Sequence, residues 1–192
     1  MGREDAMAWT VIDGRARSIA EFAAHVAATD WTGWRPSRIV MHNTATPSLA
    51  QRPAGLTRAH LTNLETWYRD TNRWSAGPHL FIDDHAIHGF TPLNRRGVHS
   101  PSWNASAIGI ELLGDYAREP FDSGRGLAVR RLGVAAAALL CAALDIAPEA
   151  ILFHRDDPRT THSGCPGRNV VKAELVREVA AFMAGATLRL AA

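Results

Sequence analysis

Apolar residues recur along the chain in two different patterns, and their alternation predicts the order of helices and strands. Short apolar runs bounded by polar or turn residues predict strands. These runs are Ser37–His42, His79–Asp83, Ala86–Phe90, Ala107–Leu113 and Ile151–His154. Apolar residues at helical spacing predict helices after a Ser18 cap, from Thr57, over Leu127–Ile146, and from an Asn169 cap to about Ala184. The apolar positions of the helix from Thr57 are His60, Leu61, Leu64, Trp67 and Tyr68. The alternation predicts an α/β fold, with a mixed central β-sheet and helices on both faces.

The same pattern indicates how the chain is divided. Asp84 and His85 separate two apolar runs and predict a hairpin. With 192 residues and 46% apolar content, the chain can bury one substantial core. We expect an N-terminal extension with a helix over 1–36, the functional domain over 37–184, and a loosely held C-terminal tail over 185–192.

Charge and hydropathy narrow the range of partners. The net charge is only +2 and the basic residues are dispersed, which argues against a nucleic-acid partner. No uninterrupted apolar run approaches the ~18 residues of a membrane span, and the first residues carry charges where a secretory signal needs an apolar core. We therefore expect a monomer that is made in the cytoplasm and has no membrane partner.

The two cysteines lie in different settings. Cys141 is in an alanine-rich stretch and is typical of a small core residue, whereas Cys165 follows a polar loop. There is no CxxC pair that could build a structural zinc knuckle, and two such cysteines are poor evidence for a disulfide. Only Cys165 remains as a candidate for chemistry.

Two histidines occupy positions that favour metal binding. His42 and His154 each end an apolar run, so both lie where a strand passes into a loop, which is where α/β folds gather functional side chains. Nine histidines are scattered over the chain, and a single one is more often a surface or core residue. Together with Cys165, however, they form a donor set that Zn²⁺ prefers, with one position left open as in catalytic sites. The set predicts a zinc hydrolase.

Glu111 is the candidate acid or base. It lies within a predicted strand and points away from Ile108, Ile110 and Leu112. A carboxylate there is unfavourable unless it faces a polar cavity or a cation, or pairs with an arginine. The first two possibilities would make Glu111 functional, and the third would make it structural.

Five motifs follow one another along the chain: Ile39–Ala45, His79–Asp83, Gly97–His99 with Trp103 and Asn104, Ala107–Glu111, and His154–Asp156 through Cys165–Gly167. They occur in the order seen in zinc-dependent N-acetylmuramoyl-L-alanine amidases, and over about residues 38–183 the chain resembles this family. The family includes phage lysins and the peptidoglycan recognition proteins.

The resemblance implies roles for individual residues. His42, His154 and Cys165 match the zinc ligands, and Glu111 matches a catalytic glutamate. The positions implied for substrate binding are Asn43, Thr44, His79, His99, Trp103 and Asn104.

Two positions depart from the family pattern. Pro78 stands where many members have a tyrosine, and Ser163 stands where a lysine often stabilises the oxyanion. His162 is the nearest alternative donor, and Ser163, Thr160 and Thr161 are weaker ones.

The implied activity is hydrolysis of the amide bond between N-acetylmuramic acid and L-alanine in peptidoglycan, with Zn²⁺ activating water. Glu111 would move the proton, and His162 or Ser163 would stabilise the oxyanion. We favour a phage or prophage endolysin, which would be bacteriolytic and antimicrobial and would reach the wall by holin-type release. The alternative within the family is a cytosolic amidase that recycles anhydro-muropeptides. Three alternatives from other classes remain: a non-catalytic peptidoglycan-binding module, a cysteine hydrolase with Cys165 as nucleophile, and a zinc-stabilised nucleic-acid binder.

Overall fold

Six strands form one mixed sheet in the order β1-β4-β3-β5-β2-β6. The strands are β1 (Ala16–Arg17), β2 (Arg38–Asn43), β3 (Leu80–Ile82), β4 (Ile87–Gly89), β5 (Ala107–Leu112) and β6 (Ile151–Phe153). In the computed structural model, which describes the fold of residues 8–190, β3, β5, β2 and β6 are parallel, and β4 is antiparallel to β3 and β1. The predicted mixed sheet and the β3–β4 hairpin are confirmed.

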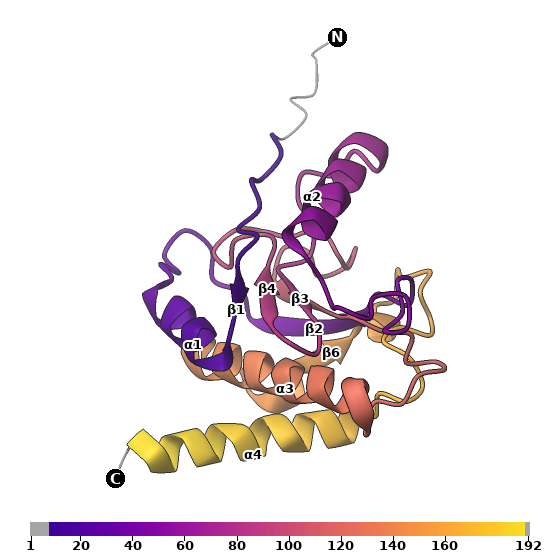
Figure 1. The fold of residues 1–192 in the computed structure, drawn as a ribbon. Helices are drawn as coiled ribbons and strands as arrows, with labels where there is room; N and C mark the ends of the chain where they lie inside the picture. Colours follow the sequence, from indigo (N-terminus) through magenta and orange to yellow (C-terminus); the bar gives the residue numbers. More distant parts are fainter. Residues whose placement is uncertain (1–7, 191–192) are drawn as a thin grey trace.

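Helices cover both faces of the sheet, as the sequence predicts (Figure 1). They are α1 (Ile19–Ala28), α2 (Arg58–Thr66), α3 (Gly124–Leu144) and α4 (Lys172–Leu190), with a π-helical turn, η1 (Trp67–Thr71), and two short 3-10 turns, η2 (Pro148–Ala150) and η3 (His154–Asp156). Helix α3 packs on β3, β4 and β5 and is flanked by α1 and α4, while α2 lies on the opposite side of the sheet.

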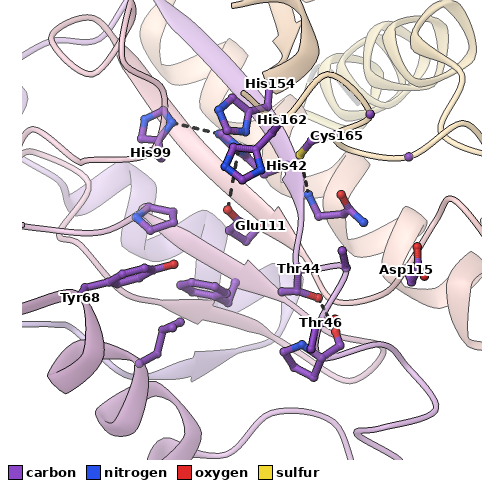
Figure 2. Close-up of a pocket in the computed structure, with 18 of the residues that line it drawn as sticks. His42, Thr44, Thr46, Tyr68, His99, Glu111, Asp115, His154, His162 and Cys165 are labelled. Atoms are coloured by element: carbon purple, nitrogen blue, oxygen red, sulfur yellow. Dashed lines mark hydrogen bonds and ion pairs between the residues drawn. The ribbon is translucent and has the colours of Figure 1, made fainter. Parts of the chain in front are cut away.

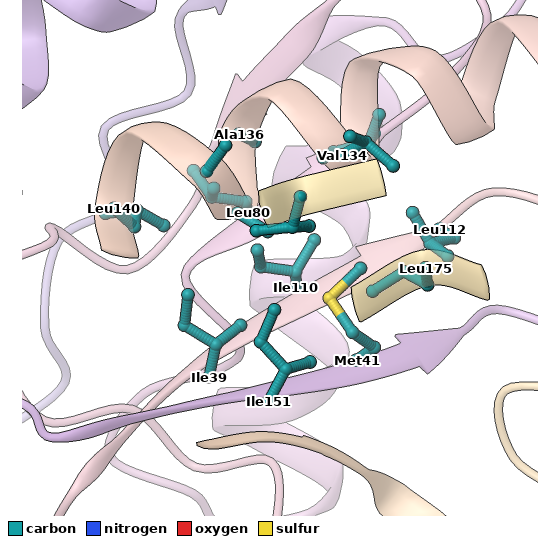
Figure 3. Close-up of a cluster of buried hydrophobic side chains, with 14 of the residues drawn as sticks. Ile39, Met41, Leu80, Ile110, Leu112, Val134, Ala136, Leu140, Ile151 and Leu175 are labelled. Carbon is teal, nitrogen blue, oxygen red and sulfur yellow. The ribbon is translucent and has the colours of Figure 1, made fainter. Parts of the chain in front are cut away.

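The strand alternation separates two hydrophobic cores. Ile39, Ile110 and Leu80 belong to the larger core under α3, where Gly133 lets the helix approach closely (Figure 3). A Cβ on Gly133 would lie 2.8 Å from the Leu112 side chain. The smaller core, on the α2 side, contains Leu61, Tyr68, Phe81, Phe90 and Ile12. Each fully buried isoleucine or leucine contributes about 1.5 to 3 kcal/mol of burial free energy.

The helix boundaries agree with the sequence at the N-terminus of α1 and differ at both ends of α4. Ser18 caps α1 in a capping box with Glu21, as predicted. Asn169 does not cap α4, which begins at Lys172, because its side-chain amide donates to the Glu119 carbonyl oxygen over 2.8 Å. Helix α4 also continues past residue 184 to Leu190, since one glycine costs only about 1 kcal/mol and the residues after it sustain a helix.

The predicted extension and tail are partly described. Strand β1 pairs with β4, so part of the 1–36 extension belongs to the sheet. Residues 1–7 and 191–192 lie outside the described part of the chain.

Helix α3 has the length and average hydropathy of a membrane span, although we expected no such segment. The difference arises because an average tolerates the arginines that interrupt this run. Of its most apolar window, 61% is buried inside the structure, between the sheet and the neighbouring helices. Burial of this kind is typical of a core helix.

Candidate metal centre and active site

Three side chains form one row across the middle of the sheet on the α2 side. His42 on β2 pairs in register with Glu111 on β5, and Glu111 pairs with Phe81 on β3. Residues paired in a parallel sheet point to the same face, so all three project away from α3. The strand register therefore places a carboxyl group beside a histidine, and Glu111 points away from Ile110 as the sequence predicts.

His154 and Cys165 join this row from the loop after β6. The ligand atoms of His42, His154 and Cys165 all lie within 4.8 Å of one another, and the two imidazole centroids are 4.4 Å apart (Figure 2). The backbone N–H of Arg155 donates to the Cys165 carbonyl oxygen over 3.0 Å, which closes the loop. The N–H of Asn43 donates to the Cys165 sulfur over 3.4 Å. The three predicted ligands thus converge from distant parts of the sequence.

The donor set fits a tetrahedral zinc ion. Ligand atoms around such an ion are about 3.3 to 3.8 Å apart, so only a small contraction is needed. Burial lowers the pKa of His42 well below its usual value and that of His154 to about 4, which keeps both imidazoles neutral, as ligands must be. Burial, with a smaller effect from Glu111, raises the pKa of the Cys165 thiol to about 12, so the thiolate needs a neighbouring cation.

A chain of hydrogen bonds orients His42. His99 Nε2 lies 3.1 Å from the Ala107 carbonyl oxygen, which can only accept, so this nitrogen carries the proton. Burial lowers the pKa of His99 to about 4, so its ring is neutral and Nδ1 is an acceptor. His42 Nε2 lies 3.1 Å from His99 Nδ1 and must therefore donate to it. The lone pair of His42 is then on Nδ1, which is the nitrogen that faces Glu111.

A glycine makes room for this chain. A Cβ on Gly109 would lie 2.5 Å from Cγ of His99. The glycine at position 109 of β5, two residues before Glu111, therefore leaves space for the His99 ring, which orients His42.

Glu111 is buried beside the candidate ligands. Its side chain is 14% exposed, and Oε1 lies 3.9 Å from His42 Nδ1. Burial raises its pKa to about 8, so a nearby cation is needed to favour the carboxylate at neutral pH. No arginine of the described chain forms an ion pair with Glu111. The structural alternative, an arginine–carboxylate pair, is thus not what holds this side chain.

A cavity of about 710 Å³ opens over the centre. His42, His154, Cys165 and Glu111 all line it. The lining also includes three of the residues predicted to bind substrate: Asn43, Thr44 and His99. Asn43 and Thr44 use their side-chain donors within the protein, towards the carbonyl oxygens of Gly114 and Pro47.

The other residues predicted to bind substrate lie outside the cavity lining. His79 accepts from the Gly109 N–H and donates to the Arg95 carbonyl, each over 2.9 Å, so both ring nitrogens are occupied. The Asn104 side chain accepts from the N–H groups of His99 and Ser100. Asn104 and His79 therefore hold the backbone around the site, and Trp103 is half-buried beside them.

The two predicted oxyanion donors differ in position. His162 is exposed, lines the cavity, and stacks on His154 with ring centroids 5.1 Å apart. Ser163 is exposed and does not belong to the lining. The structure therefore favours His162 over Ser163 as the residue within reach of a substrate.

Several cavity residues are absent from the sequence-based prediction, and Tyr68 is the one with a buried hydroxyl group. The sequence predicts Tyr68 only as an apolar position of the helix from Thr57, yet it lies in η1 and lines the cavity together with Glu111. The available signal was its hydroxyl group, because a tyrosine at a core position needs a partner for its polar end.

The fold and site define an α/β domain with a candidate set of metal-ligand side chains at one end of its parallel strands. Residues 32–168 match the model of the N-acetylmuramoyl-L-alanine amidase family, which is more than half of the chain, and the protein belongs to this family. It is 26% identical over 99 residues to peptidoglycan-recognition protein 1 of Holotrichia diomphalia. That match covers 48% of this chain and 49% of the relative, so the chain spans about half the length of the curated relative it matches.

Solved structures show the same fold. The endolysine N-acetylmuramoyl-L-alanine amidase LysCS from Clostridium intestinale URNW superposes with a TM-score of 0.60 at 23% identity, covering 79% of this chain and 91% of that one. Drosophila PGRP-LB superposes with a TM-score of 0.59 at 20% identity, covering 77% and 82%. At these identities the likeness shows the fold alone.

Proposed function

We propose that the chain is a zinc-dependent N-acetylmuramoyl-L-alanine amidase that cleaves the bond between N-acetylmuramic acid and the L-alanine of the stem peptide. The observation that carries this proposal is the convergence of the His42, His154 and Cys165 donor atoms within 4.8 Å. The buried Glu111 lies beside them in a cavity large enough for a substrate segment. Family membership supports amidase chemistry.

The residues supply complementary parts of the reaction. When bound by His42, His154 and Cys165, Zn²⁺ would polarise the scissile carbonyl and acidify water. Glu111 takes a proton from the attacking water as the C–O bond forms, and returns it to the departing L-alanine nitrogen when the C–N bond breaks. His42 Nδ1 lies 3.9 Å from this carboxylate and would be one of the atoms that hold the ion.

The alternatives from other classes receive less support. A binding module without catalysis would need neither a complete donor set nor a buried glutamate beside it, and this chain has both. A cysteine hydrolase needs an available thiolate, and the raised pKa of Cys165 opposes it in the absence of a cation. The chelator experiment described below distinguishes this case.

We further propose that the protein acts as a phage or prophage endolysin on intact wall, rather than on soluble anhydro-muropeptides. Its relatives of the same fold include endolysins, which supports this choice without deciding it. The monomeric state and the cytoplasmic site of synthesis remain predictions from the sequence.

A digestion experiment tests both levels of the proposal. The purified protein is incubated with intact sacculi and, separately, with soluble anhydro-muropeptides, and the products are identified by mass spectrometry. We expect new L-alanine amino termini from sacculi, loss of activity with a chelator, and recovery with Zn²⁺. A Glu111→Gln control should retain zinc and lose about 10² to 10⁴ in turnover.

Each unexpected result has a separate meaning. If products form from anhydro-muropeptides and not from sacculi, the protein is a recycling enzyme and not an endolysin. Inactivation by thiol alkylation without any effect of chelators would favour the cysteine hydrolase. Near-normal turnover of folded, zinc-bound Glu111→Gln would show that the glutamate assignment is wrong.

A further inference from the structure

Tyr68 is carried by an unusual turn at the end of α2. Residues Trp67–Thr71 form a π-helical turn, in which the Asn72 N–H donates to the Trp67 carbonyl oxygen over 3.1 Å. Such turns are rare and often occur at functional sites, because the wider turn changes the direction of the side chains that follow. Trp67 is 49% exposed, whereas the adjacent Tyr68 is 8% exposed. Tyr68 thus lies on the inward face of the helix, and the turn leads the chain back so that the Trp74 N–H donates to the Tyr68 carbonyl oxygen over 3.0 Å.

The ring of Tyr68 is held by other aromatic groups. It stacks on Trp74 with centroids 4.8 Å apart and 19° between the planes, and it meets Phe90 edge-on at 5.9 Å. It belongs to the same core as Phe81, which is the register neighbour of Glu111 on the α2 side of the sheet. Figure 2 shows the hydroxyl end of Tyr68 on the side of Glu111. The ring is thus fixed near the row that carries the candidate site.

The hydroxyl of Tyr68 has no hydrogen-bond partner among the described residues, although the side chain is more than nine-tenths buried and lines the cavity. The chain has two tyrosines, and the other one differs in this respect. The Tyr116 hydroxyl donates to the Leu113 carbonyl oxygen over 2.7 Å. A positioned phenol without a protein acceptor is available for a ligand in the cavity.

The described lining of the cavity offers no cationic donor for a developing negative charge, and its neutral donors differ in burial. No lysine or arginine belongs to its described lining. The single lysine, Lys172, pairs with Asp156 over 2.6 Å. Asn43 and Thr44 already donate to carbonyl oxygens of the protein, and His162 is exposed to solvent. Four further lining residues carry side-chain donors but are less buried than Tyr68, namely Thr46, Trp67, Asn72 and Trp74. Tyr68 combines a buried position with a free donor.

We propose that Tyr68 is a further catalytic residue, whose hydroxyl donates a hydrogen bond to the scissile carbonyl oxygen as negative charge develops on it. The role rests on the proposed amidase function. As the water oxygen bonds to the carbonyl carbon, an electron pair moves onto the carbonyl oxygen, and Tyr68 stabilises that charge while keeping its proton. When the C–N bond breaks, the pair returns and Glu111 delivers the proton to nitrogen.

The protonation state of Tyr68 suits a donor. Burial, and to a smaller extent Glu111, raises the pKa of Tyr68 above its usual value. The phenol therefore keeps its proton throughout the neutral range, and it supplies a hydrogen bond without acting as a base.

The test compares the two tyrosines, each changed to phenylalanine. Tyr68→Phe removes one oxygen that has no partner in the protein, so the fold and zinc content should be unchanged by circular dichroism and elemental analysis. We expect its kcat on muropeptides to fall about 100-fold, with KM within about threefold. The matched control Tyr116→Phe should keep kcat and lower the thermal midpoint, because it removes a structural hydrogen bond.

A binding measurement provides a second readout. A phosphonate analogue of the scissile amide carries charged oxygens where the oxyanion would form. Its inhibition constant should rise about 100-fold in Tyr68→Phe, while the affinity for the amine product should not change.

The outcomes separate the two proposals. If the wild type turns over muropeptides and Tyr68→Phe keeps its kcat and its affinity for the phosphonate, only the Tyr68 role is overturned. The role is also overturned if Tyr68→Phe loses zinc or stability to the extent that kcat falls. If the wild type hydrolyses no muropeptide, the proposed amidase function itself fails.

Discussion

Replacing His99 with leucine should weaken zinc binding even though His99 is not one of the candidate ligands. In the structure, His99 accepts a hydrogen bond from His42 Nε2 and donates one to the Ala107 carbonyl oxygen, each over 3.1 Å. Leucine has a similar volume but neither polar atom. The His42 ring then loses the contact that keeps its proton on Nε2 and its lone pair on Nδ1.

The magnitude follows from the groups left without partners. His42 is 1% exposed, so water does not readily replace His99. A hydrogen-bond partner of a metal-bound histidine contributes 10- to 100-fold in metal affinity, or about 1.4 to 2.7 kcal/mol. In His99→Leu, His42 Nε2 and the Ala107 carbonyl oxygen both lose their partners, at about 1 to 3 kcal/mol each. The free energy of unfolding of the metal-free protein should therefore fall by about 2 to 6 kcal/mol.

Asparagine at the same position separates the two effects. The Oδ1 atom of asparagine can occupy the place of His99 Nδ1 and accept from His42, but the contact with Ala107 is lost. We expect His99→Asn to retain most of the zinc affinity and to lose about 1 to 3 kcal/mol of stability. Zinc affinity is measured by competition with a chromophoric chelator, and stability by urea unfolding of the metal-free protein. Equal zinc affinities for wild type and His99→Leu would refute the orienting role of His99.

Three further predictions address the metal, the hairpin and the exposed histidine. Cys165→Ala should purify without stoichiometric zinc by elemental analysis, and full occupancy would contradict the ligand set. Burial alone would raise the pKa of Asp83, but hydrogen bonds from His88, Leu56 and His85 lower it to about 2. Asp83 therefore adds about 2 kcal/mol to the free energy of unfolding above pH 4, and this contribution is lost as the pH falls towards 2. Asp83→Asn should lower the free energy of unfolding at pH 7 by about that amount and make it depend less on pH between 4 and 2. His162→Ala should keep kcat within about tenfold, because the ring is exposed; a 100-fold loss would instead make His162 the oxyanion donor.

The part of the site that could be predicted from the sequence is the part fixed by strands. His42 ends an apolar run, and Glu111 interrupts one, so the two-residue period gives both their location and the face on which they lie. The central strands were predicted to within a residue or two for the same reason. That His42 and Glu111 lie side by side, in contrast, depends on the sheet order β5-β2-β6, which cannot be predicted from local hydrophobic patterns. The sequence supplied that information only through the resemblance to a family.

The loop residues show where such prediction ends. The resemblance to the family implies that His79, Trp103 and Asn104 bind substrate, but in the structure none of them belongs to the cavity lining. Whether a loop side chain faces a substrate or the backbone depends on nearby carbonyl and N–H groups, and Asn104 satisfies two such N–H groups. Polar type alone does not distinguish these two uses.

Tyr68 illustrates a different limit, which concerns helical periodicity itself. Together with Leu61 and Leu64, Tyr68 has the spacing of one apolar helical face, and the prediction that it packs inward is confirmed. The period carries no information on what holds the ring, because the π-helical turn that begins at Trp67 redirects the chain after Tyr68 and places Trp74 against it. If that turn fixes the Tyr68 ring, deleting one of its residues should shift Trp74 and release the ring from its stacking contact. We expect Asp70 deletion, at an exposed position of the turn, to preserve zinc binding and to lower kcat about as much as Tyr68→Phe does. A deletion variant that folds and keeps wild-type kcat would show that the turn is not what aligns Tyr68 with the substrate.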